Sequence, residues 1–145
     1  MILKNKVINF LGDSITQGVG GTGFAQDGEV IPFSGSEWRV NTSGYCWANI
    51  FKDYISSKFG NTVINYGTRG VRSYDIAREL AANNGYVTDE DKLLIVMIGT
   101  NNKWAPSYGN LPDLKNDLQF IVDWCEANGK KLILISAPMS TVQTD

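Results

Sequence analysis

Histidine is missing from this sequence of 145 residues, and cysteine occurs only twice. A metal site built from histidine and cysteine is therefore excluded, and no phosphate-binding Gly-Lys-Ser/Thr loop is present. The two cysteines, Cys46 and Cys125, fall on faces of predicted helices, which favours small buried core residues over a disulfide or a metal pair. The sequence thus implies neither a metal nor an organic cofactor.

Long hydrophobic runs and a positive net charge are also missing. The longest apolar runs, such as residues 93–98, are far too short to span a bilayer, and a net charge of -2 offers no basic surface to nucleic acid. The first residues do not resemble a secretion signal, because Lys4 and Lys6 bracket the polar Asn5 and a strand-like run follows. These absences predict a cytoplasmic protein without membrane or nucleic-acid partners.

The residues that are present indicate one globular domain. Hydrophobic residues make up 43% of the sequence and charged residues 19%. Four short, mostly apolar runs each end at or near a glycine or serine, and none alternates cleanly, which is typical of strands buried on both faces of a parallel sheet. We expect these strands at residues 7–11, 63–66, 93–98 and 132–135.

Helical patterns separate these strands. Apolar residues recur at spacings of three and four over residues 47–59, 76–80 and 114–125. Ser73 can cap the second helix, while Gly60 and Gly129 follow the first and the third. The alternation of strands and helices predicts right-handed crossovers and a three-layer α/β sandwich.

Residues 19–42 break this regularity. They hold five glycines and one proline and show no clean period. A loop of this length inside a compact domain is usually functional or disordered. We expect it to lie over or beside the binding site and either to be mobile or to carry Trp38 toward that site.

Three polar segments follow the first three strands. They are residues 12–18 (GDSITQG), 65–73 (NYGTRGVRS) and 99–102 (GTNN). In open α/β sheets, ligands bind outside the carboxyl ends of the strands, so the three segments are expected to meet at one edge of the sheet.

The residue types in these segments suit acyl transfer. Ser14 can present a hydroxyl nucleophile, Gly70 allows a backbone N–H to approach closely, and Asn101 offers a side-chain amide. Together with the N–H of Ser14 these groups supply three donors to an oxyanion, and one such donor is worth roughly 3 to 4 kcal/mol in the transition state.

These segments resemble the motifs of the SGNH/GDSL hydrolases. Residues 12–16 look like the GDSL block that carries the nucleophile, Asn65-x-Gly67-x-x-Gly70 looks like the second block, and residues 99–102 look like the third, Gly-x-Asn-Asp. The resemblance runs from about residue 7 to 138. It implies a flavodoxin-like three-layer α/β/α sandwich with parallel strands in the order second, first, third, fourth. It also implies the catalytic residues Ser14, Gly70 and Asn101.

Two departures from the family stand out. Asn102 occupies the position where the family usually has Asp. The family's fourth block, Asp-x-x-His, supplies the general base and its orienting carboxylate, but the sequence has no histidine and Asp145 follows the fourth strand too soon. We therefore expect a chain that lacks the last strand and helix, with an exposed apolar edge at residues 132–135 that favours self-association.

Each residue also has a structural interpretation. Ser14 can simply cap a helix, Gly70 can mark a turn, and Asn101 can satisfy backbone groups. Asp13 is interpreted mainly as a carboxylate that stabilises the turn, and it joins Trp38 and Trp104 as candidate substrate contacts. Core or rim packing is the alternative for both tryptophans.

A glycine pattern, G-x-G-x-x-G at residues 18–23, is also present, but it neither follows a strand directly nor opens a helix, which argues against dinucleotide binding. The resemblance instead implies hydrolysis of acetyl or short acyl esters of carbohydrates, with a small-molecule or glycan ester as substrate. The alternative is a catalytically inactive domain of the same fold that binds a glycan or an acylated ligand, or a degenerate fragment without enzymatic function.

Overall fold

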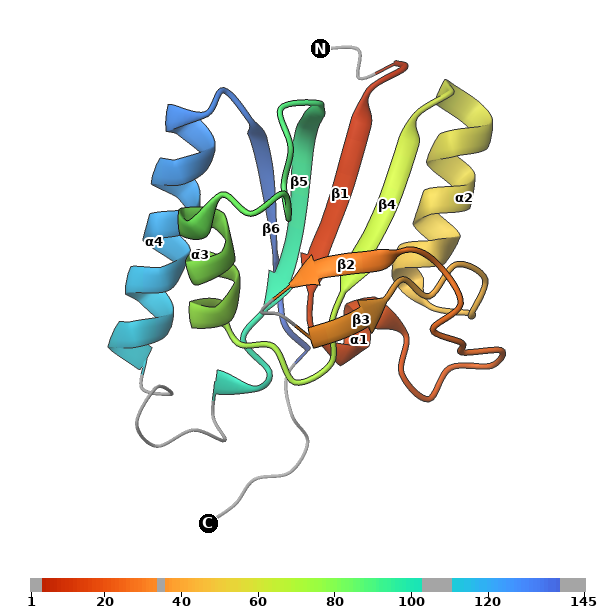
Figure 1. Cartoon of the computed structure of the whole chain (residues 1–145), viewed down its shortest axis with the longest axis horizontal. Helices are drawn as coiled ribbons and strands as arrows, with labels where there is room; N and C mark the ends of the chain where they lie inside the picture. Colours follow the sequence, from red (N-terminus) through yellow and green to blue (C-terminus); the bar gives the residue numbers. More distant parts are fainter. Residues whose placement is uncertain (1–3, 34–35, 103–110, 139–145) are drawn as a thin grey trace.

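The computed structural model describes residues 4–33, 36–102 and 111–138. Its central feature is a parallel four-stranded sheet in the order β4-β1-β5-β6 (Figure 1). This is the order predicted from the sequence, with all four strands found at their expected positions. The strands are β1 (Val7–Gly12), β4 (Thr62–Gly67), β5 (Asp91–Ile98) and β6 (Lys131–Ser136).

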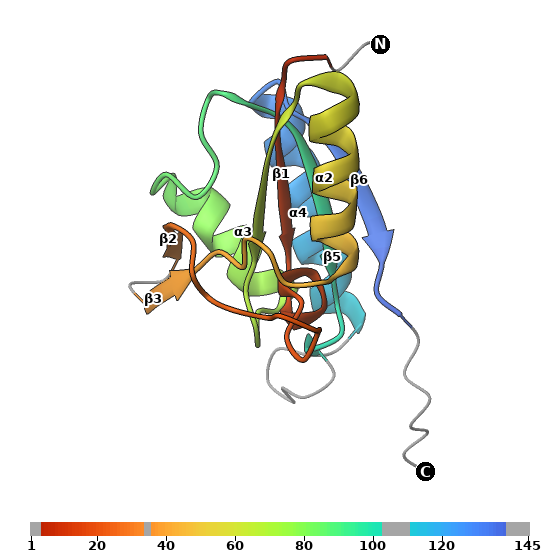
Figure 2. The same ribbon diagram turned by 90° about the vertical axis from the view of Figure 1, so that its right-hand side faces the viewer.

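Helices cover both faces of this sheet, which makes the fold a three-layer α/β/α sandwich. Helix α2 packs on one face, and α3 and α4 pack on the other, as the edge-on view in Figure 2 shows. Alternate residues of β5 serve the two layers: Leu94 and Val96 join the α3–α4 side, whereas Leu93 and Ile95 join the α2 side. The helices are α1 (Ser14–Gln17), α2 (Trp47–Phe59), α3 (Ser73–Ala82) and α4 (Leu111–Ala127).

Helix ends follow the signals read from the sequence. Gly60 adopts a left-handed conformation with φ of 67° and its N–H bonds to the carbonyl of Ser56, which ends α2. The N-cap of α3 is Arg72, so Ser73 is the first helical residue and not the cap that the sequence suggested. Cys125 is buried as predicted, whereas Cys46 is the half-buried N-cap of α2. Both cysteines are free.

The prediction that residues 19–42 form only irregular structure is wrong. They include an antiparallel hairpin of β2 (Val30–Phe33) and β3 (Ser36–Arg39), which lies beside the carboxyl ends of the parallel strands (Figure 1). Ile31 and Phe33 point into the core below, with exposed fractions of 0% and 5%. Their alternation covers only four residues and is interrupted by Pro32, which is why the pattern gave no clear strand signal.

Candidate active site

The carboxyl ends of three neighbouring strands bring the sequence motifs together. Gly12, the last residue of β1, is in register with Gly67 at the end of β4 and with Met97 near the end of β5. A hydrogen bond of 2.8 Å from the N–H of Thr68 to the carbonyl of Gly12 continues the contact between the first two segments beyond the sheet. The expected meeting of the first two segments at this edge is therefore present.

The turn after β1 is built around Asp13 and Ser14. Asp13 is the N-cap of α1, and its Oδ1 accepts a hydrogen bond of 2.9 Å from the N–H of Ile15. Ser14 is the first helical residue and half-buried. The one-turn helix ends at once, because Gly18 is left-handed with φ of 88° and its N–H bonds to the carbonyl of Ser14. The interpretation of Ser14 as a helix cap is thus wrong, since Asp13 has that role.

Asp13 itself is fully buried, with an exposed fraction of 0%. Burial raises the pKa of its carboxyl above the ordinary value of 3.8, and the hydrogen bond from the N–H of Ile15 opposes that rise. A carboxylate enclosed in this way supports the turn and does not face solvent, which argues against the expected substrate contact.

The second segment is fastened to the first by two buried amides. The Nδ2 of Asn65 donates to the carbonyl of Thr16 at 2.9 Å, and its Oδ1 accepts from the N–H of Gly67 at 3.0 Å. The Oε1 of Gln17 accepts from the N–H of Arg69 at 2.9 Å. A side chain at Gly67 would collide with the backbone of Thr16 and Gln17, so the close approach of the two turns requires glycine here.

Gly70 lies at the exposed tip of the second segment. Its φ of 79° is left-handed, and a Cβ there would meet no atom within 4 Å. The requirement for glycine at this position therefore comes from the backbone conformation and not from crowding.

Asn101 joins the third segment to the second. Its Nδ2 donates a hydrogen bond of 2.9 Å to the carbonyl of Val71, the residue after Gly70. An amide nitrogen carries two hydrogens, so one bond to Val71 fixes the orientation of the side chain and leaves a second donor. Asn101 is half-buried, which keeps part of the side chain accessible.

Asn102 lies beneath this contact with an exposed fraction of 3%. Its Oδ1 accepts from the N–H of Ser73 at 3.2 Å, and its Nδ2 donates to the Ser73 Oγ at 2.7 Å. The Ser73 hydroxyl in turn donates to the Oδ2 of Asp117 on α4 at 2.6 Å. The third segment is therefore connected through Ser73 to two helices.

A match to a family model identifies the protein family in which this site occurs. The model of the GDSL-like Lipase/Acylhydrolase family matches residues 10–144. The chain belongs to this family. Among curated proteins, none matches the sequence.

Solved structures share the fold of this GDSL-like chain. Axe2, an acetylxylan esterase from Geobacillus stearothermophilus, is similar with a TM-score of 0.63 at 19% identity, over 92% of this chain and 61% of that one. LAE5, an alpha/beta hydrolase enzyme from the metagenome of Lake Arreo, Spain, has a TM-score of 0.65 at 19% identity, over 90% of this chain and 60% of that one. The chain thus spans about three-fifths of the length of these proteins. Variants of Axe2 that replace a serine, an aspartate or a histidine by alanine are described as catalytic mutants.

Sequence reasoning identified the motif residues of this GDSL-like site but missed the side chains that fasten them. Gln17 and Asn65 were seen only as parts of motifs, and their hydrogen bonds to the other segment carried no local signal. Trp38 is half-buried and lines a pocket of about 220 Å³ together with Gly70. Trp104 lies outside the described residues.

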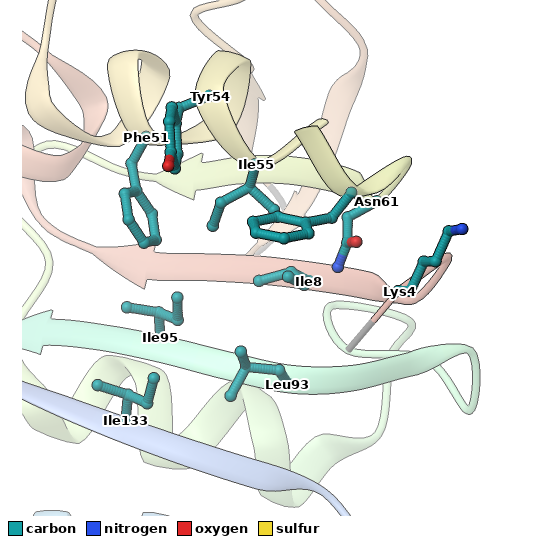
Figure 3. Close-up of a pocket in the computed structure, with 10 residues that line it drawn as sticks. Lys4, Ile8, Phe51, Tyr54, Ile55, Asn61, Leu93, Ile95 and Ile133 are labelled. Carbon is teal, nitrogen blue, oxygen red and sulfur yellow. The ribbon is translucent and has the colours of Figure 1, made fainter. Parts of the chain in front are cut away.

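An apolar groove lies elsewhere in the described structure, with a volume of about 430 Å³. It runs between α2 and the sheet face, between Phe51, Tyr54 and Ile55 on one side and Leu93 and Ile133 on the other (Figure 3). None of the three motif segments lines it.

The described residues offer neither a metal-binding cluster nor a membrane-spanning helix. No cluster of three or more histidine, cysteine, aspartate or glutamate side chains suited to a metal ion was found among them. No helix within residues 4–33, 36–102 and 111–138 has both the length and the apolar character needed to cross a membrane.

Proposed function

We propose that this chain carries the nucleophile and the oxyanion donors of a serine esterase that hydrolyses acetyl or short acyl esters of carbohydrates. The observation that carries the proposal is the hydrogen bond from Asn101 to the carbonyl of Val71. It holds the side-chain amide against the segment that contains Gly70, and we place both groups on the edge of the sheet where the Ser14 turn also lies. The acetylxylan esterase among the structural neighbours supports the substrate class by analogy.

In this proposal the Ser14 Oγ attacks the acyl carbon. A base takes the serine proton and passes it to the departing alcohol, and water then cleaves the acyl-serine ester and regenerates Ser14. The carbonyl oxygen becomes negatively charged in each tetrahedral intermediate. The N–H groups of Ser14 and Gly70 and the free amide hydrogen of Asn101 stabilise that charge.

Neither Asp13 in the first motif segment nor Asp75 in the first turn of α3 is available as the base. Asp13 is enclosed and already occupied as the N-cap of α1. Asp75 accepts from the backbone and side chain of Arg72 and forms an ion pair with Arg78. Since these 145 residues contain no histidine, the histidine base implied by the family resemblance has to come from outside them.

Imidazole added to the solution tests whether Ser14 acts as the nucleophile once a base is supplied from outside the chain. We expect the chain alone to hydrolyse 4-nitrophenyl acetate barely above background, because serine without a base is a weak nucleophile. Added imidazole should produce a Ser14-dependent rate and a transient acetyl group on Ser14, detected by mass spectrometry. The Asn101→Ala change should lower that rate by roughly 10²- to 10³-fold, the usual cost of one oxyanion donor.

Imidazole also cleaves aryl acetates directly, so the Ser14→Ala variant gives the rate to subtract. Ser43→Ala, which alters an exposed loop serine, is the matched control and should behave as the unchanged chain does. Equal imidazole-dependent rates with and without Ser14, together with no acetylated Ser14, would refute the proposed nucleophile.

A second candidate function is supported by the lack of histidine and by Asn102 at the family's Asp position. A non-catalytic domain of this fold would bind an acetylated oligosaccharide without ever becoming acetylated. Binding that is measurable by calorimetry, combined with no acetyl transfer to Ser14 in imidazole, would favour this function.

A further inference from the structure

The pocket beside Gly70 contains a cation that the proposed reaction does not use. Besides Gly70, the charged and aromatic residues that line the pocket are Trp38 from the hairpin, Arg69, Arg78 and the acidic Asp75. Arg69 precedes the proposed oxyanion donor directly, and its guanidinium carbon lies 5.4 Å from the centre of the Trp38 ring. A group bound in this pocket would therefore lie next to the proposed reaction centre.

The charges around the pocket are not balanced. Arg72 and Arg78 both pair with Asp75, and Arg78 also bonds to Glu79 at 2.9 Å. No side chain that the structure describes forms an ion pair with Arg69. One positive charge thus remains at the mouth of the pocket, on a molecule whose net charge is -2.

Arg69 is also held in place before any ligand arrives. Its backbone N–H donates to the Oε1 of Gln17, which is itself only 1% exposed. The Trp38 ring restrains the guanidinium through a cation–π contact, and a guanidinium carries its N–H donors along its edges. Such an edge matches the two oxygens of a carboxylate, and a prearranged guanidinium loses little side-chain entropy on binding.

We propose that this pocket binds the alcohol half of the substrate and that this half is a sugar bearing a carboxylate, a uronic acid unit. The inference rests on the proposed function, in which the acetyl group lies at the oxyanion donors and the pocket beside Gly70 is left to the alcohol half. Arg69 pairs with the carboxylate, and Trp38 acts as a positioning residue for Arg69.

Binding of glycosides that carry no ester tests this without any catalysis. In an NMR titration of the 145-residue chain, methyl glucuronide should bind at least about tenfold more tightly than methyl glucoside and should shift the Gly70 N–H and Trp38 indole signals. Arg69→Gln should abolish the preference. Arg69→Lys should retain only part of it, because lysine keeps the charge but not the paired donors. Trp38→Leu should weaken the preference by releasing Arg69.

Arg39→Gln is the matched control, since Arg39 is an exposed arginine of the same hairpin that bonds to the carbonyl of Gly28. It should leave the preference unchanged, and so should Ser14→Ala. Sodium acetate distinguishes a sugar-borne carboxylate from any carboxylate and should bind no better than methyl glucoside. Equal binding of the two glycosides, or an acid preference that survives in Arg69→Gln, would overturn the proposal. If the Arg69-dependent preference holds while Ser14 is never acetylated, only the proposed hydrolysis fails.

Discussion

Asp13 stands next to the proposed nucleophile, yet its environment suits a neutral side chain better than a charged one. The carboxyl is enclosed, and its Oδ1 accepts a single backbone hydrogen bond from Ile15. An asparagine side chain could accept the same bond without carrying a charge into the protein interior. The turn at Ser14 therefore depends on the acceptor at this position and not on its charge.

The raised pKa of Asp13 gives a prediction for stability. Between the ordinary carboxyl value of 3.8 and the higher folded pKa, the native state holds a proton that the unfolded chain has lost. The free energy of unfolding should therefore fall as pH rises through this window, by at most about 1.4 kcal/mol per pH unit from this group. Asp13→Asn lacks this loss, so it should gain stability relative to the native chain as pH rises.

Urea unfolding of both chains from pH 3.5 to pH 7 measures the difference. Asp53→Asn, which removes a carboxylate whose side chain is 78% exposed, accounts for the change in overall charge. A difference between the native chain and Asp13→Asn that does not change with pH would contradict the prediction.

At the scale of elements, the Ser73 hydroxyl on α3 connects the segment after β5 with α4. The Ser73 hydroxyl accepts a hydrogen bond from the Asn102 amide and donates its own hydrogen to Asp117. Because the hydroxyl has only one hydrogen, one of these partners has to be a donor and the other an acceptor. The Asp that the family usually has at position 102 would turn the donor into a second acceptor. This chain therefore combines the unusual Asn102 with an acceptor on α4.

We predict that Asn102→Asp lowers the free energy of unfolding by about 1 to 3 kcal/mol, because two carboxylates then compete for one hydroxyl hydrogen. Adding Asp117→Asn should restore much of the loss, since the amide can donate to Ser73 while the new carboxylate accepts from it. The double-mutant cycle should give a coupling energy within the usual range of about 0.5 to 3 kcal/mol. Asp123→Asn, on an exposed position of α4, is the control. Additive effects of the two changes would argue against the shared hydroxyl.

The same elements show what the sequence could and could not predict. Short apolar runs identified the parallel strands, because burial on both faces leaves a strong compositional signal, and the family resemblance implied their order. The hairpin was missed because its strands are four residues long and contain Pro32. The hydrogen bonds of Asn65 and Gln17 between the first two motif segments were missed for another reason. Their partners lie 49 and 52 residues away along the chain, so no local sequence pattern indicates them.

At the scale of the whole molecule, β6 is the exposed edge that the sequence predicted. It pairs only with β5 among the described strands. Ile133 and Leu134, which point to opposite faces, are 47% and 44% exposed. The apolar groove between α2 and the sheet ends at Ile133 (Figure 3). An unpaired strand edge beside an apolar groove favours association with another chain.

We predict that two copies of the 145-residue chain associate through β6, with the groove of each covered by the other. Sedimentation velocity should show a dimer that dissociates on dilution. Ile133→Lys should shift the population to monomer without unfolding it, because this side chain is already half exposed in the single chain. Val19→Lys changes another exposed apolar residue, 43% exposed, and should leave the association intact. A monomer at all concentrations for the unchanged chain would contradict the prediction.

The central position of β1 has a consequence for how the chain is made. This strand emerges first from the ribosome, but both of its neighbours, β4 and β5, are synthesised later. Roughly 50 residues separate β1 from β4, which at about 5–20 residues per second leaves the strand without a neighbour for several seconds. Phe10 and Leu11, both 0% exposed in the finished fold, have no sheet to enter during that time. The nascent chain therefore presents this largely apolar strand to the ribosome exit and to chaperones before the sheet can begin to form.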